Sequence, residues 1–538
     1  MKSVFTSSKP DPREVMELKA YYEKQREGVR VKWATALAFY NRTRPVWQDL
    51  AGNPIEGSEN RSRYHPSTPT SIIDHAADQH FSHSPKVHCY HAGEGKEHQK
   101  KAGLKEKWAE AVLNDCAAKV PYLLFRQIVK QLELYGYTPA SVQLALDDLP
   151  VEPEEPERGK DDDDETYNRR IRSYAARAQA YKSGRLNFNP FRIEVPPPTW
   201  VLMDPFDLEP KCAIRVFKME SWRLNGLAVE KQMEQLRGAS KEVYEVPAVD
   251  EKSMFTMVDC TELWTPMVHE LYKGNTVGAN RIFTEKNPWG FIPWSQAYSG
   301  NGMEEPTLTN MERDMAPLCV SLLEPVFDEL IMLAMQVNGQ HQGALDDSYL
   351  QLFAEDDEQA FKLAQSIAHS GIGVGKKDSA WWNARPAMAP FVEQVTANVL
   401  RNIEVATFNL QQAGFKEAGV DTATGQMIRS NAAGKKSIPV TKQLEQLATS
   451  LMQRIFKQAQ VLFDMGVVNS ITVRGVTLNS EDLDGITDCA VTFPSIDPVV
   501  EQQLKEVAMR EVAQGLMTEQ EFYEKFGGED WIGHRDQR

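Results

Sequence analysis

Two stretches of the chain hold residue types that could do chemistry at a useful spacing. The first, GIGVGKK at 371–377, has the glycines and lysine of a phosphate-binding loop. A Walker A loop also needs a glycine five residues before its Gly-Lys pair and a hydroxyl residue after the lysine. Here Ser370 stands in place of that glycine and Lys377 in place of the hydroxyl. We therefore interpret the stretch as a flexible turn with two exposed bases, Lys376 and Lys377.

The second stretch holds seven of the 11 histidines, with Asp74, Asp78 and Cys89 among them. A zinc site needs four such ligands converging as a tetrahedron, with further groups to orient them. The spacing matches no zinc-binding pattern, so we interpret this stretch as polar surface and predict no metal site. The seven are His65, His75, His80, His83, His88, His91 and His98.

Catalytic motifs are otherwise missing from the sequence, which contains no nucleophile elbow, no His-Glu-x-x-His helix and no dinucleotide-binding fingerprint. Paired carboxylates single out nothing in a chain with 76 acidic residues. The 6 cysteines are scattered without a CxxC pair, which is typical of packed thiols in a reducing compartment. The sequence therefore predicts a protein that is not an enzyme and has no cofactor.

Length, charge and hydropathy exclude several further classes of protein. The 538 residues suffice for several domain-sized units, and the net charge is −16. That charge argues against a chain that wraps nucleic acid through a broad basic surface. The most apolar stretch, 318–337, is interrupted by three acidic residues, and the N-terminus lacks an apolar core. We therefore expect neither a transmembrane span nor a secretory signal.

The first half of the chain reads as helices followed by strands. Helices are expected over 14–41, 71–81 and 104–135. The last carries an apolar stripe, is bent or split into two helices at Pro121 and ends at Gly136 before a strand. An acidic segment, 152–165, carries a net charge of −7 and precedes a basic helix that could fold back on it. The stripe of the third helical region consists of Trp108, Val112, Cys116, Val120 and Leu124.

Residues 188–300 alternate short β-type runs with Pro and Gly, which predicts a β-rich domain containing one short helix at 227–236. A helix interrupted by Pro317 and Pro325 follows, then a mixed insert, a helix with a single apolar stripe and a polar loop of small residues. Pro439 is expected to start a long helix, since proline suits the first helical position. The fold class is α+β. The buried face of the long helix should contain Val440, Leu444, Leu447, Leu451, Ile455, Ala459 and Leu462.

The order of these parts resembles the portal proteins, or head-to-tail connectors, of tailed bacteriophages. IEVPPPTWVLMDP is similar to a family strand that ends in Asp-Pro. VDCTELWTP is similar to the family's acidic-aromatic strand, and NPWGFIPW to its Gly-x-Pro segment. The C-terminal VTFPSIDPVVEQQLKEVAMREVAQGLMTEQEFYEKF is similar to the family's ending of a strand, a proline and two helices. The resemblance covers nearly the whole chain and is carried by the order of the parts.

The resemblance implies a ring-forming portal fold with an α/β wing, a helical stem, a small clip and a tunnel loop. No long C-terminal barrel is expected. By position, the implied parts are a wing over 1–308, stem helices over 309–339 and 391–413 with a clip over 340–390 between them, a tunnel loop over 414–437, and 438–538 as long helix, wing strand and C-terminal wing or crown helices.

The resemblance also implies a function. The chain would form a ring of identical subunits, expected to number twelve, at one capsid vertex of the virion. The ring would be assembled in the host cytoplasm and would not contact a membrane. Double-stranded DNA would pass through the ring during packaging and ejection. Its other partners would be the major capsid protein, the terminase and a tail adaptor. The DNA-facing residues of the tunnel loop would be Arg429, Ser430, Asn431, Lys435 and Lys436, with Lys376 and Lys377 in the clip.

Two other readings remain open from the sequence. One is another virion structural protein, such as a tail adaptor or an internal capsid protein. The other is an ATPase or nuclease of the packaging apparatus, against which the incomplete Walker A pattern counts.

Overall fold

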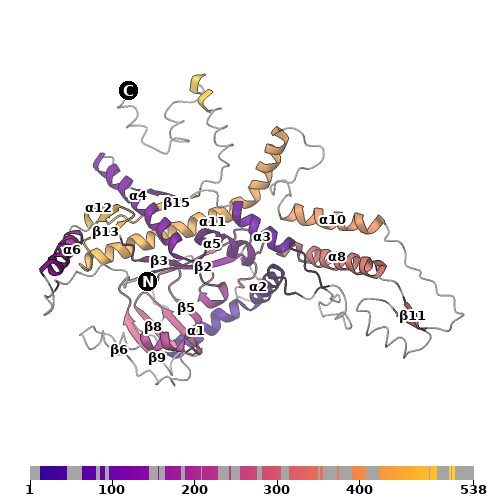
Figure 1. Cartoon of the computed structure of the whole chain (residues 1–538), viewed down its shortest axis with the longest axis horizontal. Coiled ribbons are helices and arrows are strands. Elements are labelled where there is room, and N and C mark those ends of the chain that lie inside the picture. Colours follow the sequence, from indigo (N-terminus) through magenta and orange to yellow (C-terminus); the bar gives the residue numbers. More distant parts are fainter. Residues whose placement is uncertain are drawn as a thin grey trace.

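The computed structural model is an α+β structure, in which helices and antiparallel sheets occupy separate layers (Figure 1). Within the described residues, the one parallel strand pair is β11 (Leu352–Ala354) with β12 (Ile372–Val374). The structure describes residues 12–44, 46, 63–79, 85–90, 96–144, 156, 164–182, 188–207, 209–227, 242–243, 255–274, 281–303, 314–348, 352–354, 372–374, 390–407, 423–483, 485–493, 508–510 and 512–514.

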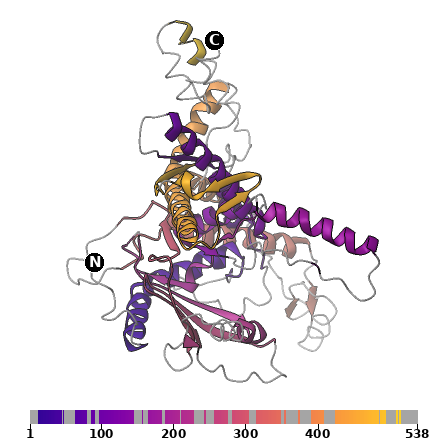
Figure 2. The same cartoon turned by 90° about the vertical axis from the view of Figure 1, so that its left-hand side faces the viewer.

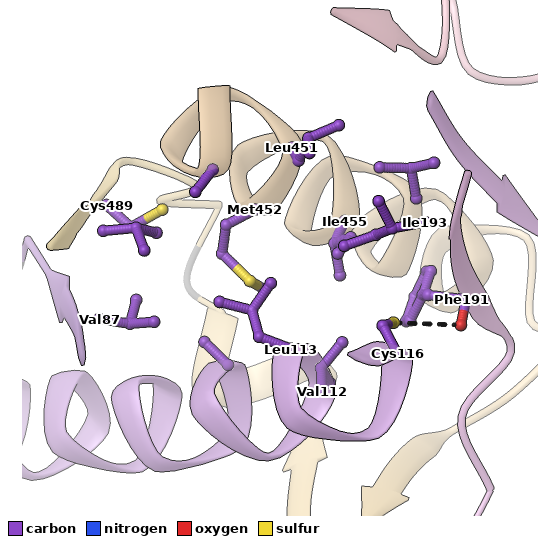
Figure 3. Close-up of a cluster of buried hydrophobic side chains, with 14 of the residues drawn as sticks. Val87, Val112, Leu113, Cys116, Phe191, Ile193, Leu451, Met452, Ile455 and Cys489 are labelled. Atoms are coloured by element: carbon purple, nitrogen blue, oxygen red, sulfur yellow. Dashed lines mark hydrogen bonds between the residues drawn. The ribbon is translucent and has the colours of Figure 1, made fainter. Parts of the chain in front are cut away.

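The largest core forms around the second half of helix α11 (Ala423–Asp464). Helices α4 (Lys96–Lys119) and α5 (Leu124–Tyr135) pack on it, and so does a three-stranded sheet of order β10-β2-β3. Figure 3 shows α4 and α11 facing one another, with Val112 and Leu113 pointing toward Met452 and Ile455. All seven residues expected on the buried face of the long helix are buried, so that prediction is confirmed.

Helices α4 and α5 are separated at Pro121, as expected, because proline cannot donate the backbone hydrogen bond of a continuous helix. Four of the five stripe residues are buried, and the fifth, Val120, is half-buried against the same core. Gly136 ends α5 in the left-handed conformation with φ of 69°, and its N–H donates to the Leu132 carbonyl. Strand β2 (Tyr137–Leu144) begins directly after it, between β3 (Phe191–Glu194) and β10 (Trp294–Tyr298).

The β-rich region forms mainly one antiparallel six-stranded sheet of order β4-β5-β7-β8-β9-β6, which lies apart from the α11 layer in Figure 2. Helix α1 (Pro12–Gln25) covers one end of it through Val15 and Tyr22. Residues 221–227 are helical, and apart from residue 227 the short helix expected at 227–236 lies outside the described residues. The strands are β4 (Val201–Met203), β5 (Ala213–Glu220), β6 (Glu242–Val243), β7 (Met257–Trp264), β8 (Val268–Lys273) and β9 (Arg281–Lys286).

The single helix expected over 14–41 is two helices, α1 and α2 (Glu27–Tyr40), because Arg26 between them turns into the interior. Arg26 is 1% exposed, and its guanidinium donates to the Tyr137 hydroxyl at 3.2 Å and to the Pro198 and Val201 carbonyls. A buried charge needs such partners to offset its lost hydration. The long-range ties of Arg26 therefore decide the break, and helical periodicity alone does not reveal them.

The remaining elements extend the main body. Helix α3 (Thr68–Gln79) packs on α5, and strands β1 (Lys86–Cys89) and β15 (Cys489–Thr492) pair antiparallel although they come from opposite ends of the chain. The expected C-terminal β section is a hairpin of β13 (Ser470–Val473) and β14 (Val476–Asn479), followed by the short helix α12 (Ser480–Leu483). The expected helix after Pro498 is described only at 508–510 and 512–514, and the acidic segment 152–165 only at 156 and from 164.

We predict that Gly136→Ala destabilises the protein by about 3 kcal/mol, from a strained left-handed residue plus overpacking. A Cβ at this position would lie 2.4 Å from the Val320 nitrogen and 2.5 Å from the Cys319 carbonyl carbon. Urea unfolding measures the change. The control is Gly103→Ala in α4, where a Cβ meets nothing within 4 Å. That change should stabilise by up to about 1 kcal/mol, and equal effects of the two substitutions would contradict the explanation.

Candidate functional site

The most distinctive feature of the molecule is an antiparallel pair of helices that projects from the body. Helix α8 (Phe327–Ser348) runs outward and α10 (Pro390–Ala406) returns beside it (Figure 1). The strand pair β11–β12 comes between them in the chain, and β11 lies beyond the outer end of α8 in Figure 1. We call α8 and α10 the paired helices.

The first of the paired helices differs from the expected span 309–339. Residues 314–323 form turns, and a 3-10 turn at Glu324–Val326 leads into α8. Pro317 and Pro325 explain the late start, since proline fits the first turn of a helix but kinks or breaks a helix in its interior. Helix α8 continues nine residues past 339, so the expected boundary of the insert at 340 falls inside it.

The root of the paired helices is packed firmly against the body. Leu330 and Leu333 from α8 join Val399 and Ile403 from α10 in a core that also contains Phe39 of α2. Val395 is half-buried there, whereas Ala406 is exposed. The apolar stripe expected on this helix was Val392, Val395, Val399, Ile403, Ala406 and Leu410; three of these residues face the core, and the side chains of Val392 and Leu410 lie outside the described part. This packing fixes the direction in which the pair projects.

Polar contacts fix the same root. The Asn338 side chain is fully buried; it accepts from the Tyr64 N–H at 2.7 Å and donates to the Tyr64 carbonyl at 2.6 Å. Lys32 on α2 forms an ion pair with Glu324 just before α8. Because Asn338 satisfies both backbone groups of Tyr64, it holds that segment against α8 much as a neighbouring strand would.

The paired helices also carry large apolar side chains on their outside. Met332 on α8 is 47% exposed and Leu400 on α10 is 38% exposed. An unpaired surface helix normally shows polar residues on that side. Met332 and Leu400 therefore leave apolar side chains accessible on each of the paired helices.

The residues expected to face DNA lie at the start of α11. The polar loop expected over 414–437 is helical from Ala423 onward, so Arg429, Ser430, Asn431, Lys435 and Lys436 are on a helix and not in a loop. Their side chains, and residues 414–422, lie outside what the structure describes. Two helical turns separate Arg429 from Lys436, so their backbones share one side of α11. Alanines 432 and 433 promote this helix, because alanine has the highest helix propensity.

Pro439 lies inside α11 and not at its start, where it was expected. Proline in a helix interior removes one backbone hydrogen bond and bends the helix. Figure 1 shows the first part of α11, in orange, leaving the axis of the rest. A Cβ on Gly300 would lie 3.1 Å from the Pro439 Cβ, and Gly300 has φ of 77°. The bend is therefore seated on the turn that follows β10.

The other lysines considered, Lys376 and Lys377, lie outside the described residues. The stretch that contains them was interpreted as a flexible turn, but Ile372–Val374 within it is strand β12. Of the seven clustered histidines, His80, His83 and His91 also lie outside the described part. The described residues contain no group of three or more His, Cys, Asp or Glu that could hold a metal ion.

A charged cluster in the six-stranded sheet was missed by the sequence analysis. His269 on β8 lies between two carboxylates, with Nε2 2.9 Å from Glu262 and Nδ1 2.9 Å from Glu285. Its ring stacks on Trp264 with centroids 3.6 Å apart. Arg215 contacts both Glu262 and Glu194. Alternation along β7 could have indicated that Glu262 and Trp264 share a face, but the partners come from other strands.

The charges in this cluster stabilise one another. Burial alone would lower the pKa of His269, but the hydrogen bonds to Glu262 and Glu285 raise it above its ordinary value. Burial alone would raise the pKa of Glu262, but His269 and Arg215 lower it. The cluster is thus an ionised tie across β5, β7, β8 and β9, and its position between paired strands indicates a structural role.

The six cysteines are all unpaired and buried, as the scattered pattern indicated. Burial raises the pKa of Cys89 and Cys116 to about 12, which keeps both thiols protonated at neutral pH. Cys116 donates to the Phe191 carbonyl at 3.3 Å, drawn as the dashed line in Figure 3. The six cysteines therefore contribute to packing in the interior.

Comparison with known proteins gives no family. No protein-family model matches the chain, and no curated protein matches it. Among the helices of the described part, none has the length and apolar character needed to span a bilayer.

We predict that His269→Gln lowers the melting temperature more at about pH 6 than at about pH 9. A raised folded-state pKa gives stability that is present below the unfolded pKa and lost as the pH rises through the folded value. Thermal unfolding at both pH values measures the difference. His65→Gln is the control, since burial and Arg42 lower the pKa of His65 and the sign should reverse. A pH-independent effect of His269→Gln would contradict the ionised tie.

Proposed function

We propose that this chain is a portal protein, a subunit of a closed ring at one capsid vertex through which double-stranded DNA is packaged and ejected. The observation that carries the proposal is the antiparallel pair α8 and α10, which projects from an α+β body and is interrupted by a small strand unit. This arrangement agrees with the wing, stem and clip that the sequence resemblance implies. The ring would be expected to have twelve copies.

The exposed residues of the paired helices support a ring. A closed ring needs an interface in which two different faces of each subunit meet. Met332 and Leu400 offer apolar contact on an element that stands clear of its own body. Helices standing side by side around an axis would bury these residues, which costs nothing in backbone hydrogen bonds because helices satisfy their own.

The charge of the chain is consistent with a channel. Each phosphate that a protein neutralises adds affinity, and tight binding would stop DNA from moving. A subunit with a net charge of −16 opposes such binding. The bases Arg429, Lys435 and Lys436 on the bent part of α11 are then the candidates for weak, local contact with DNA. Because these bases lie on a helix and not in a mobile loop, they would stand at the same level along the channel in every subunit. Together they would form a ring of positive charge.

We predict that Leu400→Glu reduces the fraction of subunits in rings by about tenfold or more, because an unpaired charge would be buried at a packed interface. Mass photometry should find wild-type rings near about 730 kDa, twelve times the 60.8 kDa subunit. Asn398→Glu is the matched control, since Asn398 is exposed and polar on the same helix. Wild-type assembly by the Leu400→Glu variant would remove this face from the interface.

We predict that Lys435→Ala combined with Lys436→Ala alters the rate of DNA packaging or the retention of packaged DNA. Losing two bases per subunit removes twenty-four charges from a ring of the expected size, so the salt dependence should also weaken. An in vitro packaging assay measures both effects. The matched control is Lys442→Ala with Lys457→Ala, two lysines beyond the bend of the same helix. Identical packaging by all variants would exclude a DNA role for Lys435 and Lys436.

A further inference from the structure

Two of the six cysteines stand directly opposite each other. Cys89 on β1 is the registered partner of Cys489 on β15, although the two residues are 400 apart in the chain. Both are buried, with exposed fractions of 8% and 2%, and both belong to the core around α11. Figure 3 shows Cys489 and Val87, the neighbour of Cys89 on the inner face of β1, at the same end of that core.

This arrangement is particular to the one pair. Among the strand pairs of the described part, no other position places two cysteines opposite each other. Cys116 contacts β3 through the Phe191 carbonyl. The remaining three cysteines belong to three separate cores, and they are Cys212, Cys260 and Cys319.

The hydrogen bonds of the ladder put the two thiols where a disulfide fits. The Tyr90 N–H donates to the Asp488 carbonyl at 3.2 Å, one position beyond the cysteines. Hydrogen-bonded and non-hydrogen-bonded pairs alternate along an antiparallel ladder, so Cys89 and Cys489 form a non-hydrogen-bonded pair. The Cα atoms of such a pair lie about 4.5 Å apart, within the roughly 4.4–6.8 Å that a disulfide spans. The two sulfurs can therefore bond without a rearrangement of the backbone.

Both strands are also held in this register from outside the pair. The Cys89 N–H points away from β15 and donates to Glu106 on α4 at 3.0 Å. On the other strand, the Val491 N–H donates to the Thr449 hydroxyl on α11 at 2.9 Å. A slip of one residue would break these bonds and turn the strands' inner side chains outward. The neighbouring helices therefore keep the two thiols facing each other.

The surroundings of the thiols make their oxidation slow but its product stable. Burial raises the pKa of Cys89 and of Cys489 to about 12, and the buried Lys105 ammonium opposes that rise at both. Protonated thiols attack a disulfide slowly, because the thiolate is the nucleophile. Dithiols that resist oxidation do so because their reduced form is stabilised. Because neither thiol here is stabilised as a thiolate, the disulfide should be hard to reduce once it has formed.

We propose that Cys89 and Cys489 are an oxidisable pair, which closes to a cross-strand disulfide by exchange with a small disulfide such as oxidised glutathione. The thiolate of Cys89, the more exposed of the two, attacks one sulfur of the oxidant, forms a mixed disulfide and releases one thiol. The thiolate of Cys489 then attacks the Cys89 sulfur and releases the second thiol. The two cysteine protons end on the released thiols, so the pair loses two electrons and the oxidant gains them.

The bond would join distant parts of the chain that meet in the main body. Strand β1 packs on α4, and β15 packs on α11. A disulfide stabilises a fold mainly by restricting the unfolded chain, and the effect grows with the length of the loop that it closes. In a reducing compartment the pair would stay open, and transfer of the protein to an oxidising one would close it. The inference does not depend on the proposed ring.

The test incubates the full-length protein with oxidised glutathione overnight at mildly alkaline pH, blocks the remaining thiols after denaturation and maps the peptides by mass spectrometry without reduction. A peptide that joins Cys89 to Cys489 is expected, and the free thiols should fall from six to four. Six remaining thiols, glutathione adducts without the joined peptide, or a disulfide between other cysteines would overturn the proposal.

Two substitutions and a melting curve give a second measurement. Cys89→Ala should give no internal disulfide, whereas Cys116→Ala, the matched control in the same core, should still give the joined peptide. Oxidation should raise the melting temperature of the wild-type protein by about 3 °C and leave that of the Cys89→Ala variant unchanged. An internal disulfide in the Cys89→Ala variant, or equal melting of the oxidised and reduced wild-type protein, would contradict a stabilising bond between these two strands.

Discussion

The structure depends on burying one side of a single long helix. From Val440 to Phe463, α11 passes through the body and packs on α4, α5 and the β10-β2-β3 sheet. Each fully buried leucine there contributes roughly 1.5–3 kcal/mol. Polar side chains also hold α11 in place: Gln458 donates to the Val142 carbonyl, and Arg454 donates to the Ile292 carbonyl. Burial lowers the pKa of Arg454 to about 10 and leaves it charged at neutral pH.

The same helix links the body to the candidate functional segment. Everything before Pro439 on α11 leaves the axis that the buried part defines. The bend at Pro439 packs against Gly300, where a larger residue would collide with the proline. This contact gives the first part of α11, which carries the basic residues, a definite direction. In the proposed ring, the core of each subunit would set the position of the basic residues at the start of α11. The paired helices are positioned by a second, smaller core, in which Phe39 stacks on Phe327 with ring centroids 5.2 Å apart.

Much of this arrangement could be predicted from the sequence, and the failures have physical causes. Periodicity identified the buried face of α11, the α4 stripe and the break at Pro121, because those signals are local. It did not find the break at Arg26, which is decided by carbonyls 172 and 175 residues away. It also treated 423–437 as a loop on the strength of Gly434 and polar residues, although alanines, lysines and Met427 favour a helix. The His269 cluster needed strand pairing that no local pattern supplies.

The central claim is that this acidic chain forms a closed ring with its paired helices around a channel. Cryo-electron microscopy of the purified full-length protein tests that claim most directly. The account predicts a ring of about twelve copies with a central hole, in which α8 and α10 run along the ring axis and Leu400 faces a neighbouring subunit. A population of monomers or dimers alone, or a ring whose hole is lined by the six-stranded sheet, would contradict it.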